Sequence, residues 1–184
     1  MRKLEHHFRL AKAISLREKQ LAKDFPPDLL RIYTDFMTPV TIGRGALGGK
    51  ETSKQPHNLA LVTVHGTMLQ YGHLTDPSIK KAQNSFSMNL CEHATKRSYF
   101  TYQHILHALN QPGIKKILNN PRFKRIEFTF DCAATYESEK MLYFLTKGFA
   151  LPCLPRIFKS VRFSPQYHCH GKSNLDRRFS SLTS

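Results

Sequence analysis

The stretch RIEFTFDCAATYESEKMLYFLTKGF, from Arg125 to Phe149, carries the clearest structural signal in the chain. Its first half alternates apolar and polar side chains, which is the pattern of a strand buried on one face. The apolar positions are Ile126, Phe128, Phe130 and Cys132, and the polar positions are Glu127, Thr129 and Asp131. Its second half predicts an amphipathic helix that covers the apolar face of this strand.

The predicted helix begins near Glu137 and Glu139, because acidic side chains are favourable at a helix N-terminus, and it ends near Gly148. Its apolar side chains lie on roughly one side and are Met141, Leu142, Phe144, Leu145 and Phe149. A strand followed by a covering helix favours an α+β domain. We expect a mixed or mainly antiparallel sheet with helices packed on one face.

The order of residues from Arg125 to Pro152 resembles the C-terminal signature of the universal ribosomal protein five family of the large subunit. The shared features are a strand ending in small residues, a polar and acidic turn, a helix and a closing Gly148-Phe149. The resemblance implies a structural protein at the central protuberance, bound to ribosomal RNA and neighbouring proteins and placed beside the peptidyl-site transfer RNA. The chain departs from the family in Ala150-Leu151-Pro152, in a longer C-terminus, and in lacking the family's glycine-rich basic loop between Gly66 and Phe86. The divergent core and long extensions imply a mitochondrial member that acts in the matrix.

The composition supports a polyanion partner independently of the resemblance. The 184 residues include 28 Lys and Arg against 13 Asp and Glu, which gives a formal net charge of +15. Such a charge attracts phosphate groups or anionic lipid. A hydrophobic content of 40% is sufficient for a folded core, and no apolar run, including the one near Leu59 to Val64, approaches the length needed to span a bilayer.

The candidate RNA-binding residues are cations, many of them in adjacent pairs, at predicted loops and in the C-terminal region. They are Arg44, Lys50, Lys54, Lys80, Lys81, Lys96, Arg97, Lys115, Lys116, Arg122, Lys124, Arg156, Lys159, Arg162, Arg177 and Arg178. Arg44 and Lys50 belong to the loop GRGALGGK, which has the spacing of a dinucleotide fingerprint. The residues after it, Glu51 to Pro56, do not favour the apolar helix that such a motif opens, so a loop that contacts RNA phosphates is the better interpretation.

The chain divides into three predicted parts: a basic helical extension (1–27), an α+β ribosomal-protein-like domain (28–154) and a basic C-terminal extension (155–184). The first part has the form of a mitochondrial targeting helix, although Glu5 and Glu18 are unusual in one. The last part contains one acidic residue, Asp176, and no sustained apolar period, so we expect it to become ordered only on assembly.

Within the domain, Leu29, Leu30, Tyr33, Phe36 and Met37 recur at helical spacing and predict a helix that ends before Pro39. Strands are predicted over Pro39 to Ile42, Leu59 to His65 and Ser85 to Cys91. A further helix is predicted from His93 to Asn110. Its expected buried side chains are Tyr99, Tyr102, Ile105, Leu106 and Leu109.

No motif predicts catalysis, a metal site or a cofactor. The cysteines Cys91, Cys132, Cys153 and Cys169 form no C-x-x-C pair, and no histidine lies in a recognisable nucleophile or carboxylate motif. We therefore expect a structural protein and no enzyme. The alternative from another class is a free-standing basic protein that binds RNA or a membrane surface outside the ribosome.

Overall fold

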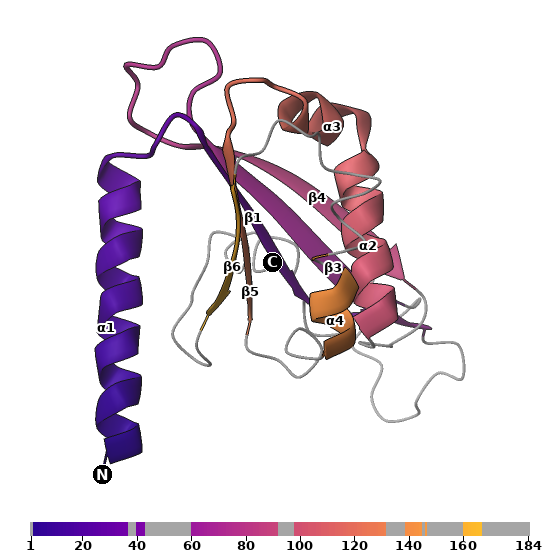
Figure 1. Cartoon of the computed structure of the whole chain (residues 1–184). Helices are drawn as coiled ribbons and strands as arrows, with labels where there is room; N and C mark the ends of the chain where they lie inside the picture. The colour runs from indigo at the N-terminus through magenta and orange to yellow at the C-terminus, as the bar shows by residue number, and fades with distance from the viewer. Residues whose placement is uncertain are drawn as a thin grey trace, which may run out of the picture.

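The computed structural model describes residues 2–36, 40–42, 60–91, 98–131, 139–144, 146 and 160–166 (Figure 1). Its helices are α1 (Arg2–Lys23), α2 (Ser98–Asn110), α3 (Pro112–Leu118) and α4 (Glu139–Tyr143). Its strands are β1 (Leu29–Phe36), β2 (Val40–Ile42), β3 (Ala60–Tyr71), β4 (Gln83–Cys91), β5 (Arg125–Asp131) and β6 (Ser160–Gln166). The architecture is α+β, as the sequence predicts.

The strands form a mixed six-stranded sheet. The hydrogen-bonded order is β2-β3-β1-β5-β6. β4 also pairs with β3, on the edge opposite β1, because the same residues of β3 pair with both strands. The chain first runs through an antiparallel meander of β1, β3 and β4, and then adds β5 and β6 parallel to β1. The sheet is therefore antiparallel on one side of β1 and parallel on the other.

The segment that the sequence analysis assigns to a helix is the strand β1, so that prediction is wrong. Both patterns are present in the segment, because Leu30 and Ile32 also alternate with Arg31 and Tyr33. β1 lies between β3 and β5, and Leu30 and Ile32 have no exposed surface. Pairing on both edges and burial on both faces outweigh the local helical spacing.

The main core lies between the sheet and the helices α2, α3 and α4. The sheet contributes Leu30, Ile32, Ile126, Phe128 and Phe130, while α2 and α3 contribute Tyr102, Ile105, Leu109, Ile114, Ile117 and Leu118.

The buried positions predicted on α2 are confirmed for Tyr102, Ile105 and Leu109, whereas Tyr99 is 58% exposed. The strand predictions for β3, β4 and β5 are also confirmed, and α3 is a helix that the sequence analysis did not anticipate.

Helix α1 lies on the other side of the sheet from α2 and α4 (Figure 1). Its C-terminal end is held there by a small apolar cluster of Leu21, Phe25 and Leu29. The side chain of Phe8, in the N-terminal part of this helix, is 60% exposed. The basic N-terminal helix is thus a second layer of the fold and covers the face opposite the main core.

Part of the predicted C-terminal extension belongs to the sheet. Residues 160–166 form β6, which pairs in parallel with β5 along its whole length. The ring of Phe163 stacks on that of Phe128 with centroids 5.6 Å apart, and Phe163 packs against the main core. Residues 160–166, which the sequence analysis places in an extension, are therefore a strand of the sheet. The remaining tail residues lie outside the described ranges.

Candidate functional site

The face of the sheet beneath α1 carries an ordered set of polar side chains. The strand register places Arg31, Glu127 and Arg162 side by side on β1, β5 and β6. Two residues further along, the same register aligns Tyr33, Thr129 and Ser164. Because side chains two residues apart lie on the same face of a strand, these six form one row of charges and one row of hydroxyl groups.

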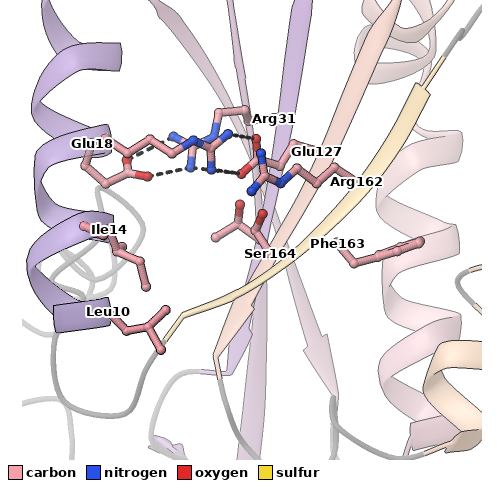
Figure 2. Close-up of a pocket in the computed structure, with 11 residues that line it drawn as sticks. Leu10, Ile14, Glu18, Arg31, Glu127, Arg162, Phe163 and Ser164 are labelled. Carbon is pink, nitrogen blue, oxygen red and sulfur yellow. Dashed lines mark hydrogen bonds and ion pairs between the residues drawn. The ribbon is translucent and has the colours of Figure 1, made fainter. Parts of the chain in front are cut away.

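Helix α1 adds Arg17 and Glu18 to the charged row, and Figure 2 shows Glu18 beside Arg31. Arg17 donates two hydrogen bonds to the Glu127 carboxylate, with N–O distances of 2.7 and 2.5 Å. Arg31 donates two to Glu18, at 3.0 and 2.6 Å, and its Nη2 also lies 3.5 Å from Glu127 Oε1. We call these four residues, Arg17, Glu18, Arg31 and Glu127, the α1–sheet ion network.

The members of the network differ strongly in burial. The side chains of Arg31 and Glu127 are 1% and 2% exposed, whereas those of Arg17 and Glu18 are 35% and 38% exposed. Burial opposes ionisation of Glu127, but hydrogen bonds and the charges of Arg17 and Arg31 outweigh it, so its pKa is lowered. Burial is the main cause that raises the pKa of the Tyr33 hydroxyl group. Arg17, Arg31 and Glu127 are therefore ionised at neutral pH.

A pocket of about 300 Å³ lies between α1 and this face of the sheet. Its lining combines apolar side chains of α1 with the polar rows of the sheet, and Figure 2 shows Leu10 and Ile14 directed from the helix toward the strands. The lining residues are Leu10, Ala13, Ile14, Arg17, Glu18, Arg31, Glu127, Thr129, Arg162, Phe163 and Ser164. We call this cavity the α1 pocket.

The opposite face of α1 is cationic and exposed. At 3.6 residues per turn, Lys12, Lys19 and Lys23 lie on one side of the helix, pointing away from the side that carries Arg17 and Leu21. All three are exposed, as is Leu16 between them. Glu5 also falls on this side and is paired with Arg9 at 2.6 Å. We call Lys12, Lys19 and Lys23 the α1 lysine stripe.

Two of the predicted RNA-binding residues extend this surface. Lys80 and Lys81 are exposed in the loop between β3 and β4. The loop is held at the C-terminal end of α1, because Phe25 N donates to Lys80 O at 2.9 Å and Lys80 Nζ lies 3.7 Å from Asp24 Oδ1. The loop that carries Lys80 and Lys81 therefore lies at the C-terminal end of α1.

The other described candidates lie on separate surfaces or make internal contacts. Lys115 and Lys116 are exposed on α3, which packs on the far side of the sheet. Arg122 donates to the carbonyl of His73 at 2.5 Å, and Lys124 is half-buried with its backbone N–H bonded to Asp28 O. Arg162 lines the α1 pocket. Arg44, Lys50, Lys54, Lys96, Arg97, Arg156, Lys159, Arg177 and Arg178 lie outside the described residues.

Sequence reasoning missed the roles of Arg17, Arg31 and Glu127. The alternating pattern of β5 predicts Glu127 only as a residue on the polar face of a strand. A usable signal was present in β1, where Arg31 and Tyr33 alternate with apolar residues and predict a strand face that is polar like that of β5. Two strands with matching polar faces indicate that both are covered by polar or charged side chains.

A pair of histidines lies on the face of the sheet that α2 covers, opposite the face beneath α1. His65 has no exposed surface, and its ring stacks on that of His104 with centroids 5.3 Å apart. Phe36 contacts the His65 ring edge-on at 4.7 Å. Burial, and secondarily the neighbouring His104, lowers the pKa of His65 to about 3. His65 is therefore a neutral core side chain.

We expect the stability of the protein to fall as the pH falls below about 6.5. The unfolded chain takes up a proton at the ordinary histidine pKa of 6.5, whereas folded His65 does so only near 3. Unfolding is then favoured by about 1.4 kcal/mol per pH unit across this interval. Urea unfolding from pH 7 to pH 4 measures the slope, which we expect to be shallower in His65→Gln. The exposed His107→Gln serves as the control, and an equal slope in all three proteins contradicts the prediction.

Within the described residues, no helix combines the length and the apolar character that crossing a membrane requires. Among the same residues, no three His, Cys, Asp or Glu side chains are grouped so that they could hold a metal ion.

Comparison with known proteins gives one distant structural neighbour. No family model matches the sequence, and no curated protein matches it. The structure is similar to the crystal structure of LC9-RNase H1, described as a type 1 RNase H with the type 2 active-site motif. The two are 14% identical, with a TM-score of 0.42 over 86% of this chain and 72% of that one. This degree of similarity assigns neither a family nor an activity to the chain.

Proposed function

We propose that the protein is an RNA-binding structural component of a ribonucleoprotein particle, and that the α1 lysine stripe is its main RNA contact. The observation that carries the proposal is the two-sided character of α1. One side is fixed to the sheet by the ion network, while the other presents Lys12, Lys19 and Lys23 to solvent. A helix held in this way presents its cations without the ordering cost of a flexible tail.

The spacing of the stripe suits a phosphate backbone. With a rise of 1.5 Å per residue, Lys12 and Lys23 are roughly 16 Å apart along the helix. Lys80 and Lys81 continue the surface beyond the end of α1. Ammonium groups at successive positions contact phosphates without reading base sequence, as expected of a protein that docks on folded RNA.

The particle that we propose is the large ribosomal subunit of a mitochondrion. This finer proposal rests on the resemblance of Arg125 to Pro152 to the ribosomal protein five family and on the net charge of +15. Its partners are ribosomal RNA, neighbouring ribosomal proteins of the central protuberance and the peptidyl-site transfer RNA. The protein acts there in assembly, without catalysis or a cofactor.

Sedimentation tests the particle. Mitochondrial extract is separated on a sucrose gradient, and the endogenous protein is detected with an antibody. We expect it to migrate with the large subunit and to shift to lighter fractions after ribonuclease treatment. Migration with slow-sedimenting material before ribonuclease treatment, or with membranes, would support the free-standing alternative and contradict the ribosomal proposal.

RNA affinity should depend steeply on salt and on the lysine stripe. Each phosphate neutralised contributes about 0.7 to the slope of log affinity against log salt on single strands and about 0.9 on duplexes. The triple change Lys12→Gln, Lys19→Gln and Lys23→Gln should therefore reduce the slope by roughly 2. The slope is measured by fluorescence anisotropy with structured ribosomal RNA fragments between 50 and 300 mM KCl.

The exposed Lys140 on α4 provides the matched control, since Lys140→Gln removes a charge from a different surface. We expect its slope to equal that of the wild-type protein. A second comparison uses Lys115→Gln with Lys116→Gln on α3. If this pair lowers the slope and the α1 triple does not, the RNA surface lies on α3 and our assignment of the interface is wrong.

A further inference from the structure

The geometry points to the α1 pocket as a binding site for a small amphipathic monocarboxylate. This inference concerns the buried side of α1 and does not depend on the RNA proposal, which concerns the outward side. It follows from the charge of the pocket, from two buried polar atoms that line it, and from its apolar wall.

The charge of the pocket favours an anion with one negative charge. Arg17, Arg31 and Arg162 line it together with two carboxylates, those of Glu18 and Glu127. Three guanidinium groups against two carboxylates leave one positive charge without a counterpart in the lining. A carboxylate supplies one negative charge, whereas a phosphate monoester carries about 1.5 to 2 at pH 7. The balance therefore favours a carboxylate over a phosphate.

Two buried atoms in the lining are available to bind it. Arg31 is 1% exposed and Thr129 is 2% exposed, and both line the pocket. Among the described residues, Arg31 Nε and Thr129 Oγ1 have no hydrogen-bond partner. An unpaired buried donor is costly, and a ligand oxygen that accepts from both would relieve the cost. A carboxylate has two oxygens that accept such bonds.

The strand register places these two donors close to each other. Arg31 is aligned with Glu127, and Thr129 is the next residue on the same face of β5. Ser164, aligned with Thr129 on β6, has its side chain hydrogen-bonded to Glu127. The carboxylate of the ligand therefore lies between Arg31 and Thr129, with Arg162 on its β6 side.

The other wall of the pocket determines the rest of the ligand. On α1, Leu10 and Ile14 point toward the sheet (Figure 2), and the apolar Ala13 also lines the pocket. The volume of about 300 Å³ is at the lower end of the range for small-molecule sites, roughly 300–1,000 Å³. An acyl chain of medium length satisfies both the size and the apolar wall. The ligand class is thus a medium-chain acyl carboxylate.

Calorimetric titration of the full chain with octanoate tests the inference. Acetate supplies the carboxylate without the chain, and 1-octanol supplies the chain without the charge. We expect saturable one-to-one binding of octanoate and at least tenfold weaker binding of the other two compounds. Absence of octanoate binding, or equal binding of 1-octanol, would overturn the proposal.

Variants then locate the binding. Thr129→Val removes the hydroxyl group at nearly constant volume and should weaken octanoate binding about fivefold, the value of one hydrogen bond. Thr67→Val is the matched control, because Thr67 is also fully buried with an unpaired hydroxyl group but does not line the pocket. Equal weakening in both variants would overturn the assignment to this pocket.

Two further variants keep the test decisive if Thr129→Val does not fold. Arg162→Gln removes an exposed cation at the rim, and Ile14→Phe fills the apolar end of the pocket. We expect Arg162→Gln to weaken octanoate binding several-fold and Ile14→Phe to abolish it, with far-ultraviolet circular dichroism unchanged. Wild-type affinity in both variants would mean that octanoate binds elsewhere and that the inference is wrong.

Discussion

Replacing Glu127 with alanine lowers the free energy of unfolding by about 3–5 kcal/mol, the usual cost of breaking a buried ion pair by removing one partner. The Glu127 side chain is 2% exposed and accepts two hydrogen bonds from Arg17. It also lies 3.5 Å from the guanidinium of Arg31, which is 1% exposed. Its removal leaves a buried cation with a single carboxylate, Glu18, that is partly solvated. Chemical denaturation followed by circular dichroism measures the loss.

Two variants separate charge from packing in this test. Glu127→Gln keeps the shape of the side chain and removes only the charge, and we expect most of the loss to remain. Glu5→Ala breaks the exposed ion pair between Glu5 and Arg9, in which the Glu5 side chain is 64% exposed and the Arg9 side chain 78% exposed. This variant should change stability by less than about 1 kcal/mol. A loss in Glu127→Ala no larger than in Glu5→Ala would show that the ion network does not hold α1 on the sheet.

Replacing Phe128 with alanine should be equally costly, for a different reason. Phe128 is 2% exposed in the middle of β5 and belongs to the main core, where its ring stacks on Phe163 of β6. Truncation removes the transfer free energy of the ring and leaves a cavity between the sheet and the helices. The expected loss is about 3–5 kcal/mol. The same denaturation measurement gives the value.

The control for Phe128 is Val161, a residue of β6 that is 45% exposed. Val161→Ala should change stability by about 0.5 kcal/mol or less, as most surface substitutions do. Phe163→Ala removes the ring that stacks on Phe128. Phe163 belongs to β6, which lies outside the domain predicted from the sequence, so this variant tests whether β6 contributes to the core. Unchanged stability in Phe163→Ala would mean that β6 does not support the core.

Helix α1 connects the proposed functions with the fold. Its inward side supplies Arg17 and Glu18 to the ion network and Leu10 and Ile14 to the α1 pocket. Its outward side carries the lysine stripe. The ion network holds on the sheet the same helix that we propose binds RNA. The Glu127 variants should therefore also weaken RNA binding, because they release α1 from the sheet.

Elements whose side chains follow a single period could be predicted from the amino-acid sequence. The alternation from Ile126 to Asp131 predicted β5 and identified its buried face, and the spacing of Tyr102, Ile105 and Leu109 predicted α2 and its contact with the core. The net charge of +15 predicted a polyanion partner. These properties are local or additive, because an element's apolar side must be buried against something wherever the element lies.

The partners that cover those faces depend on contacts between distant parts of the chain. β1 carries both a helical and an alternating pattern, and its pairing with β3 and β5 selects the strand. β6 is too polar to be predicted alone and is stabilised by pairing with β5 and by the contact of Phe163. Arg17 and Glu127 are 110 residues apart in sequence, so no local pattern connects them. A buried charge is stable only beside its counterion, and that pairing exists only once the fold has brought the two residues together.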